Sequence, residues 1–108
     1  MEIGDDPEAA VRGADVLVAD VWISGGLEAE AEKRREDFAG YCLDKGKLAL
    51  ANPEAMVLHC LPAHRGEEIS EDVIEGPQSK VFDEAENRLW AQQALLAITL
   101  GLPADITG

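Results

Sequence analysis

The sequence predicts an α/β fold with a three-stranded parallel sheet and flanking helices. Short apolar runs of strand length occur at residues 16–19, 56–60 and 80–82, and segments with helical composition separate them. Strands that alternate with helices form parallel sheets with right-handed crossovers. Because three strands are few for such a sheet, we expect a partial doubly wound, Rossmann-like domain.

The first predicted helix starts at a capping residue. Asp6 precedes Pro7, which favours an N-cap followed by proline in the first helical position, and Gly13 would end the helix near Arg12. Residues 16–19 are apolar throughout, which is typical of a strand that is buried on both faces. Residues 21–23 would extend this strand.

The middle of the chain predicts short helices. Residues 27–38 are rich in Ala, Glu, Lys and Arg, with mixed charge pairs, and indicate a helix that mostly faces water. A second short helix is expected around residues 47–50, before the strand at 56–60. Ser70 is placed to cap another helix that runs to Ile74.

The last predicted helix is the longest. Residues 83–86 resemble a capping box, and the helix would run to about Leu100. Its large apolar residues do not keep to one narrow stripe, so most sides of the helix should be covered. In a chain this short, we expect the cover to come from another chain or domain.

Charge and composition exclude several classes of protein. The chain has 108 residues and a net charge of -13, with 22 acidic against 9 basic residues, which argues against nucleic-acid binding. No apolar run is long enough to span a bilayer, and the first residues do not resemble a secretory signal. Cys42 and Cys60 are expected to be free thiols in the cytoplasm.

Polar residues follow all three predicted strands. In open α/β sheets, ligands bind beyond the carboxyl ends of the strands, so these side chains should meet at one edge. The residues at the three ends are Asp20, Trp22 and Ser24, then His59 and Cys60, then Asp83, Glu86, Asn87 and Arg88. This convergence predicts a functional site.

Structural explanations remain open for the main candidates. Asp20 can cap a turn, Cys60 can be a small buried hydrophobe, and His59 can be a core histidine that bonds a backbone carbonyl. Arg88 can pair only with Glu84 on its own helix.

The remaining polar residues also have structural explanations. Ser24 can belong to loop chemistry, His64 and Arg65 can hold their loop, and Glu67 and Glu68 can be charges at a helix start. The sequence has no zinc spacing, P-loop or dinucleotide fingerprint, so no metal and no cofactor are expected.

Two segments carry a specific resemblance. Residues 59–69 read His-Cys-Leu-Pro-Ala-His-Arg-Gly-Glu-Glu-Ile, and residues 82–89 read Phe-Asp-Glu-Ala-Glu-Asn-Arg-Leu. Together with Ala-Asp-Val at 14–16 and Asp-Val-Trp-Ile-Ser at 20–24, they resemble the ornithine carbamoyltransferases over nearly the whole chain. The resemblance implies transfer of the carbamoyl group of carbamoyl phosphate to ornithine, which gives citrulline and phosphate in arginine biosynthesis.

The resemblance also implies roles for residues at the ornithine end of the site. Asp20 and Ser24 would hold the amino-acid end of ornithine. Cys60 would lie at the δ-amino group as a proton acceptor or orienting group. A thiolate there would need a lowered pKa, which nearby cations can supply.

The carbamoyl group would have its own contacts. Cys60, Leu61 and Arg88 would bind it, with Arg88 stabilising charge on its oxygen, and His59 would help to polarise its carbonyl. The peptide bond between Leu61 and Pro62 is expected to be cis.

The chain also departs from the resemblance. Residues 24–26 are Ser-Gly-Gly where the family has Ser-Met-Gly, and Trp90 stands where the family has histidine. No counterpart of the family's carbamoyl-phosphate domain, with its Ser-Thr-Arg-Thr loop and its His-Pro-x-Gln element, is present. Residues 1–108 are therefore expected to form a partial ornithine-binding domain that turns over little or nothing without that domain.

Three hypotheses follow for the chain's function. It is part of an ornithine carbamoyltransferase, a non-catalytic module that self-associates, or a relative that uses another amine such as putrescine. An unpaired edge on the strand at 16–19 and the apolar last helix predict a homo-oligomer.

Overall fold

The computed structural model describes residues 1–23 and 28–102, and it confirms the α/β character of the chain. The predicted ornithine-binding Ser24 and the Ser-Gly-Gly segment lie outside the described residues. In chain order, the elements are α1 (Pro7–Val11), β1 (Val16–Ala19), the 3₁₀ turn η1 (Glu28–Glu30), α2 (Ala31–Asp37), α3 (Lys45–Leu48), β2 (Met56–His59), α4 (Glu71–Ile74) and α5 (Val81–Thr99).

The described part of the chain has a two-stranded sheet, not the three-stranded sheet that we predicted. β1 and β2 are parallel, and their register runs from Val16 opposite Met56 to Ala19 opposite His59. The segment expected as a third strand begins to pair, because Val57 donates to Gln78 O and accepts from Lys80 N. The chain then enters α5 at Val81, so the pairing stops after one bridge at Ser79.

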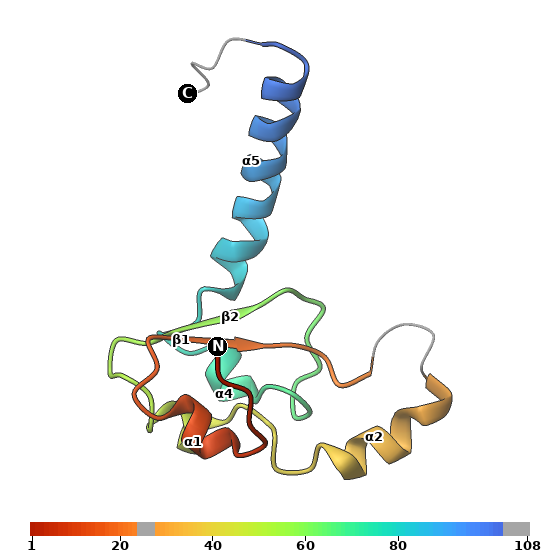
Figure 1. Cartoon of the computed structure of the whole chain (residues 1–108), viewed down its shortest axis with the longest axis vertical. Helices are drawn as coiled ribbons and strands as arrows, with labels where there is room; N and C mark the ends of the chain where they lie inside the picture. The colour runs from red at the N-terminus through yellow and green to blue at the C-terminus, as the bar shows by residue number, and fades with distance from the viewer. Residues whose placement is uncertain (24–27, 103–108) are drawn as a thin grey trace.

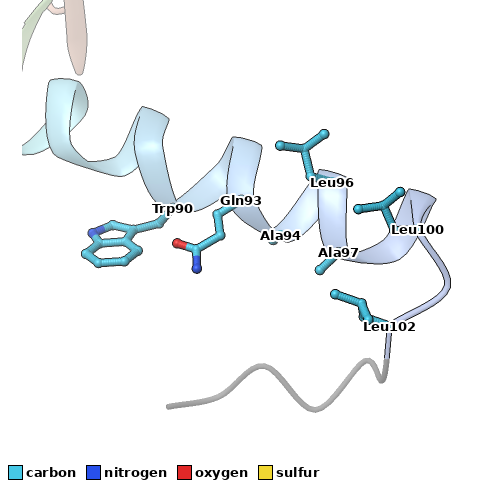
Figure 2. Close-up of a pocket in the computed structure, with 7 residues that line it drawn as sticks. All are labelled: Trp90, Gln93, Ala94, Leu96, Ala97, Leu100 and Leu102. Carbon is cyan, nitrogen blue, oxygen red and sulfur yellow. The ribbon is translucent and has the colours of Figure 1, made fainter.

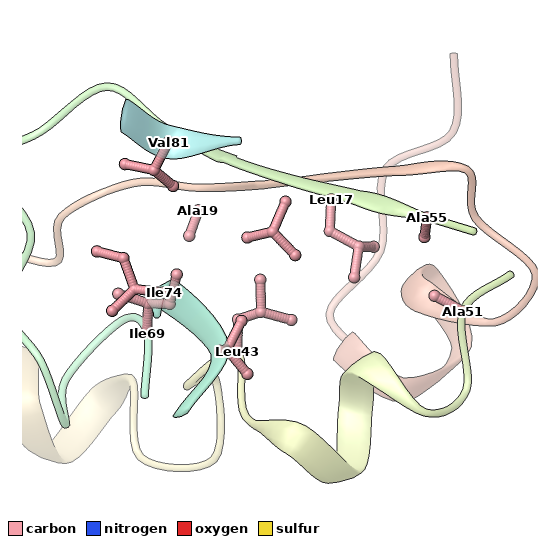
Figure 3. Close-up of a cluster of buried hydrophobic side chains, with 10 residues drawn as sticks. Leu17, Ala19, Leu43, Ala51, Ala55, Ile69, Ile74 and Val81 are labelled. Atoms are coloured by element: carbon pink, nitrogen blue, oxygen red, sulfur yellow. The ribbon is translucent and has the colours of Figure 1, made fainter. Parts of the chain in front are cut away.

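The hydrophobic core lies on one face of the sheet. Leu17, Ala19 and Val57 of the strands belong to one cluster with side chains from the loops and short helices, among them Leu43 and Ile69 (Figure 3). The opposite face is open, since Val18 is 71% exposed. The prediction that this strand is buried on both faces is therefore wrong for the described residues.

The first helix starts at its predicted cap, Ser70 precedes α4 without a side-chain cap bond, and the last helix does not start where predicted. Asp6 caps α1 as predicted, and its Oδ1 accepts from the backbone N–H groups of Glu8 and Ala9 at 3.1 and 3.2 Å. The predicted capping box at 83–86 is wrong, because α5 begins two residues earlier, after Lys80.

Helix α5 projects away from the rest of the molecule (Figure 1). Val81 is its buried residue, whereas its large apolar side chains from the first turn to the last are exposed; examples are Leu89, Trp90, Leu95, Leu96 and Ile98. The described residues of this chain thus do not cover the helix, and the expected cover from another chain or domain stays a prediction. Among the helices described, we find none with the length and hydropathy to cross a membrane.

Candidate functional site

The register of the sheet brings Asp20 and Cys60 together. Ala19 lies opposite His59 at the last paired position, so the next residue of each strand emerges at the same edge. The Cys60 thiol donates to Asp20 Oδ1 at 3.4 Å, and the same oxygen accepts the Val21 N–H at 2.8 Å. Two of the three predicted strand ends therefore converge.

The environment of the Cys60 thiol differs from the expected one. Loss of solvent around the sulfur raises the thiol pKa, and the Asp20 carboxylate raises it further by accepting the thiol proton in a hydrogen bond. The described surroundings of Cys60 therefore do not supply the lowered pKa that a thiolate requires. They favour the protonated thiol, which donates to Asp20.

His59 lies in the interior of the protein, at 1% exposure. Its Nδ1 accepts the Leu61 N–H at 2.8 Å, and its Nε2 lies 2.8 Å from Glu68 Oε1. The core-histidine explanation is correct, but the partners are an amide N–H and a carboxylate rather than a backbone carbonyl. Both ring nitrogens are engaged by protein groups, so in this chain neither is available to polarise a carbonyl.

Glu68 is a buried residue that the sequence analysis missed. We predicted a charge at a helix start, but the side chain is 2% exposed. Its Oε1 accepts from His59 and also from the His64 N–H at 2.7 Å, while Oε2 has no hydrogen bond within the described structure. A buried histidine after a strand requires a polar partner, and this requirement was the signal that could have identified Glu68.

Glu84 connects α5 to the end of β2. Its Oε2 accepts the His59 N–H at 3.0 Å. Arg88 follows one helical turn later, on the same face and about 6 Å further along the axis. It is exposed and forms no ion pair with Glu84 or any other described residue, so the helix-pair explanation is wrong.

The other residues that we expected at a third strand end lie within α5. Asp83, Glu86 and Asn87 occupy exposed positions of the helix, because the chain leaves the sheet before them. Among the described residues, none of the three forms a hydrogen bond with Asp20 or Cys60.

The backbone turns sharply after Cys60. The bond between Leu61 and Pro62 is cis, as expected, and Leu61 has a φ of 59°. A left-handed φ is uncommon for a non-glycine residue and costs about 1–2 kcal/mol, so surrounding contacts must hold it. The bond from Leu61 N–H to His59 Nδ1 is such a contact.

One group of side chains has the composition of a cation site. His64, Glu67 and Glu68 each offer a ligand atom, and these atoms lie within 4.8 Å of one another. Two of the carboxylate oxygens already have protein donors, since Glu67 Oε1 pairs with Arg35 Nε at 2.9 Å and Glu68 Oε1 has the two bonds described above. The expectation of a chain without a metal remains a prediction.

Comparisons with known proteins agree in their outcome. Residues 1–99 match a family model described as aspartate/ornithine carbamoyltransferase, Asp/Orn binding domain. An ornithine carbamoyltransferase of Geobacter sulfurreducens is 62% identical over 95 residues, which are 88% of this chain and 31% of the relative.

Solved structures give the same result. The ornithine carbamoyltransferase from Pyrococcus furiosus is 55% identical with a TM-score of 0.79, over 85% of this chain and 29% of that chain. The anabolic enzyme from Campylobacter jejuni is 41% identical with a TM-score of 0.82, over 88% and 31%. The chain thus spans about a third of the length of the relatives that it matches.

Proposed function

The chain belongs to the aspartate/ornithine carbamoyltransferase family, and from that premise we propose that it supplies the amino-acid side of a site for carbamoyl transfer to ornithine. The named relatives support ornithine as the acceptor and carbamoyl phosphate as the donor. The observation that carries the proposal is the contact between Cys60 and Asp20, because it puts a carboxylate and a thiol at the substrate edge of the sheet.

In this mechanism, the uncharged δ-amino nitrogen of ornithine attacks the carbonyl carbon of carbamoyl phosphate. The C–N bond forms, the C–O bond to phosphate breaks, and the nitrogen loses its proton to the departing phosphate. Asp20, together with Ser24, binds the amino-acid end of ornithine, where the Asp20 carboxylate pairs with the cationic α-ammonium group. Cys60 orients the δ-amino group, and its raised pKa favours an orienting thiol over a thiolate that accepts the proton.

The carbamoyl group is the partner of Arg88 and Leu61. The Arg88 guanidinium stabilises the negative charge that develops on the carbamoyl oxygen. This role of Arg88 is supported by Glu84, which lies one helical turn earlier and contacts the end of β2. That contact holds this part of α5 near the bend after Cys60. His59 does not contact the substrate in this proposal, but its Nδ1 accepts the Leu61 N–H and so holds the bend.

We assign residues 1–108 to part of an ornithine-binding domain, with the phosphate-binding groups contributed by other residues of a complete enzyme. Without those groups, the two substrates are not held together and the entropic advantage of a joint site is lost. This chain by itself should therefore have little or no activity.

Two measurements test the proposal. Calorimetry should show that the chain binds ornithine in preference to putrescine, because putrescine lacks the α-carboxylate of ornithine. Mixing the chain with a carbamoyl-phosphate domain from a relative should yield citrulline, and Cys60→Ser should abolish that activity. Equal heats for both amines, or unchanged turnover in the variant, would reject the assigned roles.

A second candidate function is self-association without catalysis. The exposed apolar residues of α5 favour it, as does a groove of about 550 Å³ along the helix between Trp90 and Leu102 (Figure 2). In this proposal, the chain forms a homo-oligomer by burying the groove. Sedimentation and the citrulline assay separate the two functions.

A further inference from the structure

The groups behind Cys60 form a continuous chain of hydrogen bonds. Glu68 Oε1 lies 2.8 Å from His59 Nε2, and His59 Nδ1 accepts from the Leu61 N–H at 2.8 Å. We propose that Glu68 is a positioning residue: it fixes the proton of His59 on Nε2, so that Nδ1 can hold the bend that places the Cys60 thiol against Asp20. The inference rests on the proposed function only in assigning Cys60 to the substrate amine.

The proton arrangement follows from the backbone donor. The Leu61 N–H can only donate, so the His59 Nδ1 that it contacts must carry a lone pair. The ring proton is then on Nε2, where it points at Glu68 Oε1. In the other tautomer, two N–H groups would face each other at Nδ1, and a nitrogen lone pair would face a carboxylate oxygen at Nε2.

The bend needs this hydrogen bond. Cys60 is the single residue between His59 and Leu61, so a bond from the His59 ring to the Leu61 amide closes a loop around it. Leu61 has a left-handed φ of 59°, a conformation that non-glycine residues leave unless contacts hold it. If the bond is lost, Leu61 can relax and the thiol can move away from Asp20.

The burial of Glu68 indicates that its Oε1 is kept in the interior to accept hydrogen bonds. The side chains of His59 and Glu68 are 0% and 2% exposed, and burying a carboxylate is costly unless it is hydrogen-bonded. Glu68 Oε1 is bonded twice, to the His59 ring and to the His64 N–H. The second bond fixes the carboxylate itself, so the ring meets an acceptor in a fixed position.

The test uses this chain with Cys42→Ser, so that Cys60 is its one thiol. The first readout is the tautomer of His59, from the ¹⁵N shifts of its ring nitrogens at about pH 7.5. The second is the pH profile of Cys60 alkylation by iodoacetamide, which reports whether the thiol still contacts Asp20. The variants are Glu68→Met, which removes the acceptor, and Glu68→Gln, which keeps an acceptor oxygen, with Glu67→Gln as the matched control.

We expect the parent chain, Glu68→Gln and Glu67→Gln to share the Nε2–H tautomer and one alkylation profile. Glu68→Met should lose the single tautomer. Its thiol pKa should fall as the Asp20 contact is lost, with alkylation about threefold faster at pH 8 for each unit of that fall, because lower nucleophilicity offsets part of the gain in thiolate. Asp20→Asn should shift the thiol profile in the same direction without changing the tautomer.

A rescue variant separates positioning from a merely structural role. In His59→Asn with Glu68→Met, the asparagine oxygen can accept the Leu61 N–H without a tautomer to set, so the parent alkylation profile should return. If Glu68 acts only as a packing residue, this double variant should show no such return.

The inference is overturned if the parent chain carries the His59 proton on Nδ1, or if folded Glu68→Met keeps the parent tautomer and thiol profile. Should Glu68→Met not fold, the parent spectrum still decides, since the Nδ1–H tautomer contradicts the proposal and the Nε2–H tautomer supports it. Failure of ornithine binding would remove the proposed function but leave these results unaffected.

Discussion

The segment that follows β2 and the long helix α5 differ in where their partners lie. At residues 59–68, His59 is bonded within the chain through both ring nitrogens and its backbone N–H. Along α5, Leu89, Leu95 and Leu96 are more than 60% exposed. The first region obtains its geometry from nearby residues of the chain, and the second presents apolar surface without a described partner.

This difference separates what the chain can do by itself from what requires a partner. The contact between Asp20 and Cys60 depends on strand register and on a bend that local hydrogen bonds hold. The position of α5 depends on its first turn, through Val81 and Glu84. Substitutions should therefore affect stability in one region and association in the other.

The largest expected effect is in the core beneath the sheet. Ile69 is 0% exposed, and Ile69→Ala should lower the free energy of unfolding by about 2–5 kcal/mol, because it leaves a cavity. Leu95→Ala, at a position 63% exposed on α5, should change it by less than about 0.5 kcal/mol. Urea unfolding measures both, and equal losses would contradict the contrast between the regions.

The next effect concerns self-association. Leu96 lines the groove on α5, and burying a leucine contributes about 1.5–3 kcal/mol, so Leu96→Glu should weaken a homo-oligomer about tenfold or more. Gln92→Glu adds the same charge to α5 outside the groove and should weaken it less. Sedimentation equilibrium measures the difference. A parent chain that is monomeric at high concentration would contradict the predicted oligomer.

The smallest effect is at a helix cap, away from both regions. Asp44 Oδ1 accepts the Lys47 N–H at 2.9 Å at the start of α3, and Asp44→Ala should cost about 1 kcal/mol, whereas Asp44→Asn keeps the cap. This hydrogen bond holds the pKa of Asp44 below its ordinary value of 3.8.

The sign of the pH dependence follows from that lowered pKa. The ionised carboxylate contributes fully above 3.8, and its contribution is lost as the pH falls through the lower pKa of the folded state. The stability difference between the parent chain and Asp44→Ala should therefore be constant near neutral pH and narrow below 3.8. A difference that grows on acidification would contradict this assignment.

The sequence predicted local features better than pairing or burial. The apolar runs at 16–19 and 56–59 are strands, and the Asp6 cap has the expected bonds. The segment at 80–82 is apolar enough for a strand, but α5 begins at Val81 and includes most of this segment. One-sided burial of β1 could not be predicted, because an apolar run does not reveal whether the rest of the chain covers one face of the strand or both.

The candidate site was predictable only where it depends on local features of the sequence. Asp20 and Cys60 each follow an apolar run directly, so their meeting follows from strand pairing. Glu68 and Glu84 were missed as site residues because they reach the end of β2 from nine and 25 residues away along the chain, and no periodic pattern identifies such contacts. The role of Arg88 stays a prediction.

The four-residue pairing of β1 with β2 makes the site sensitive to insertions and deletions rather than to substitutions alone. Side chains alternate between the two faces of a strand, and each residue advances the chain by about 3.3 Å. One residue added to either strand would turn its terminal side chain to the other face and move it along the sheet. The carboxylate and the thiol would then no longer meet, although every residue of the site would still be present in the sequence.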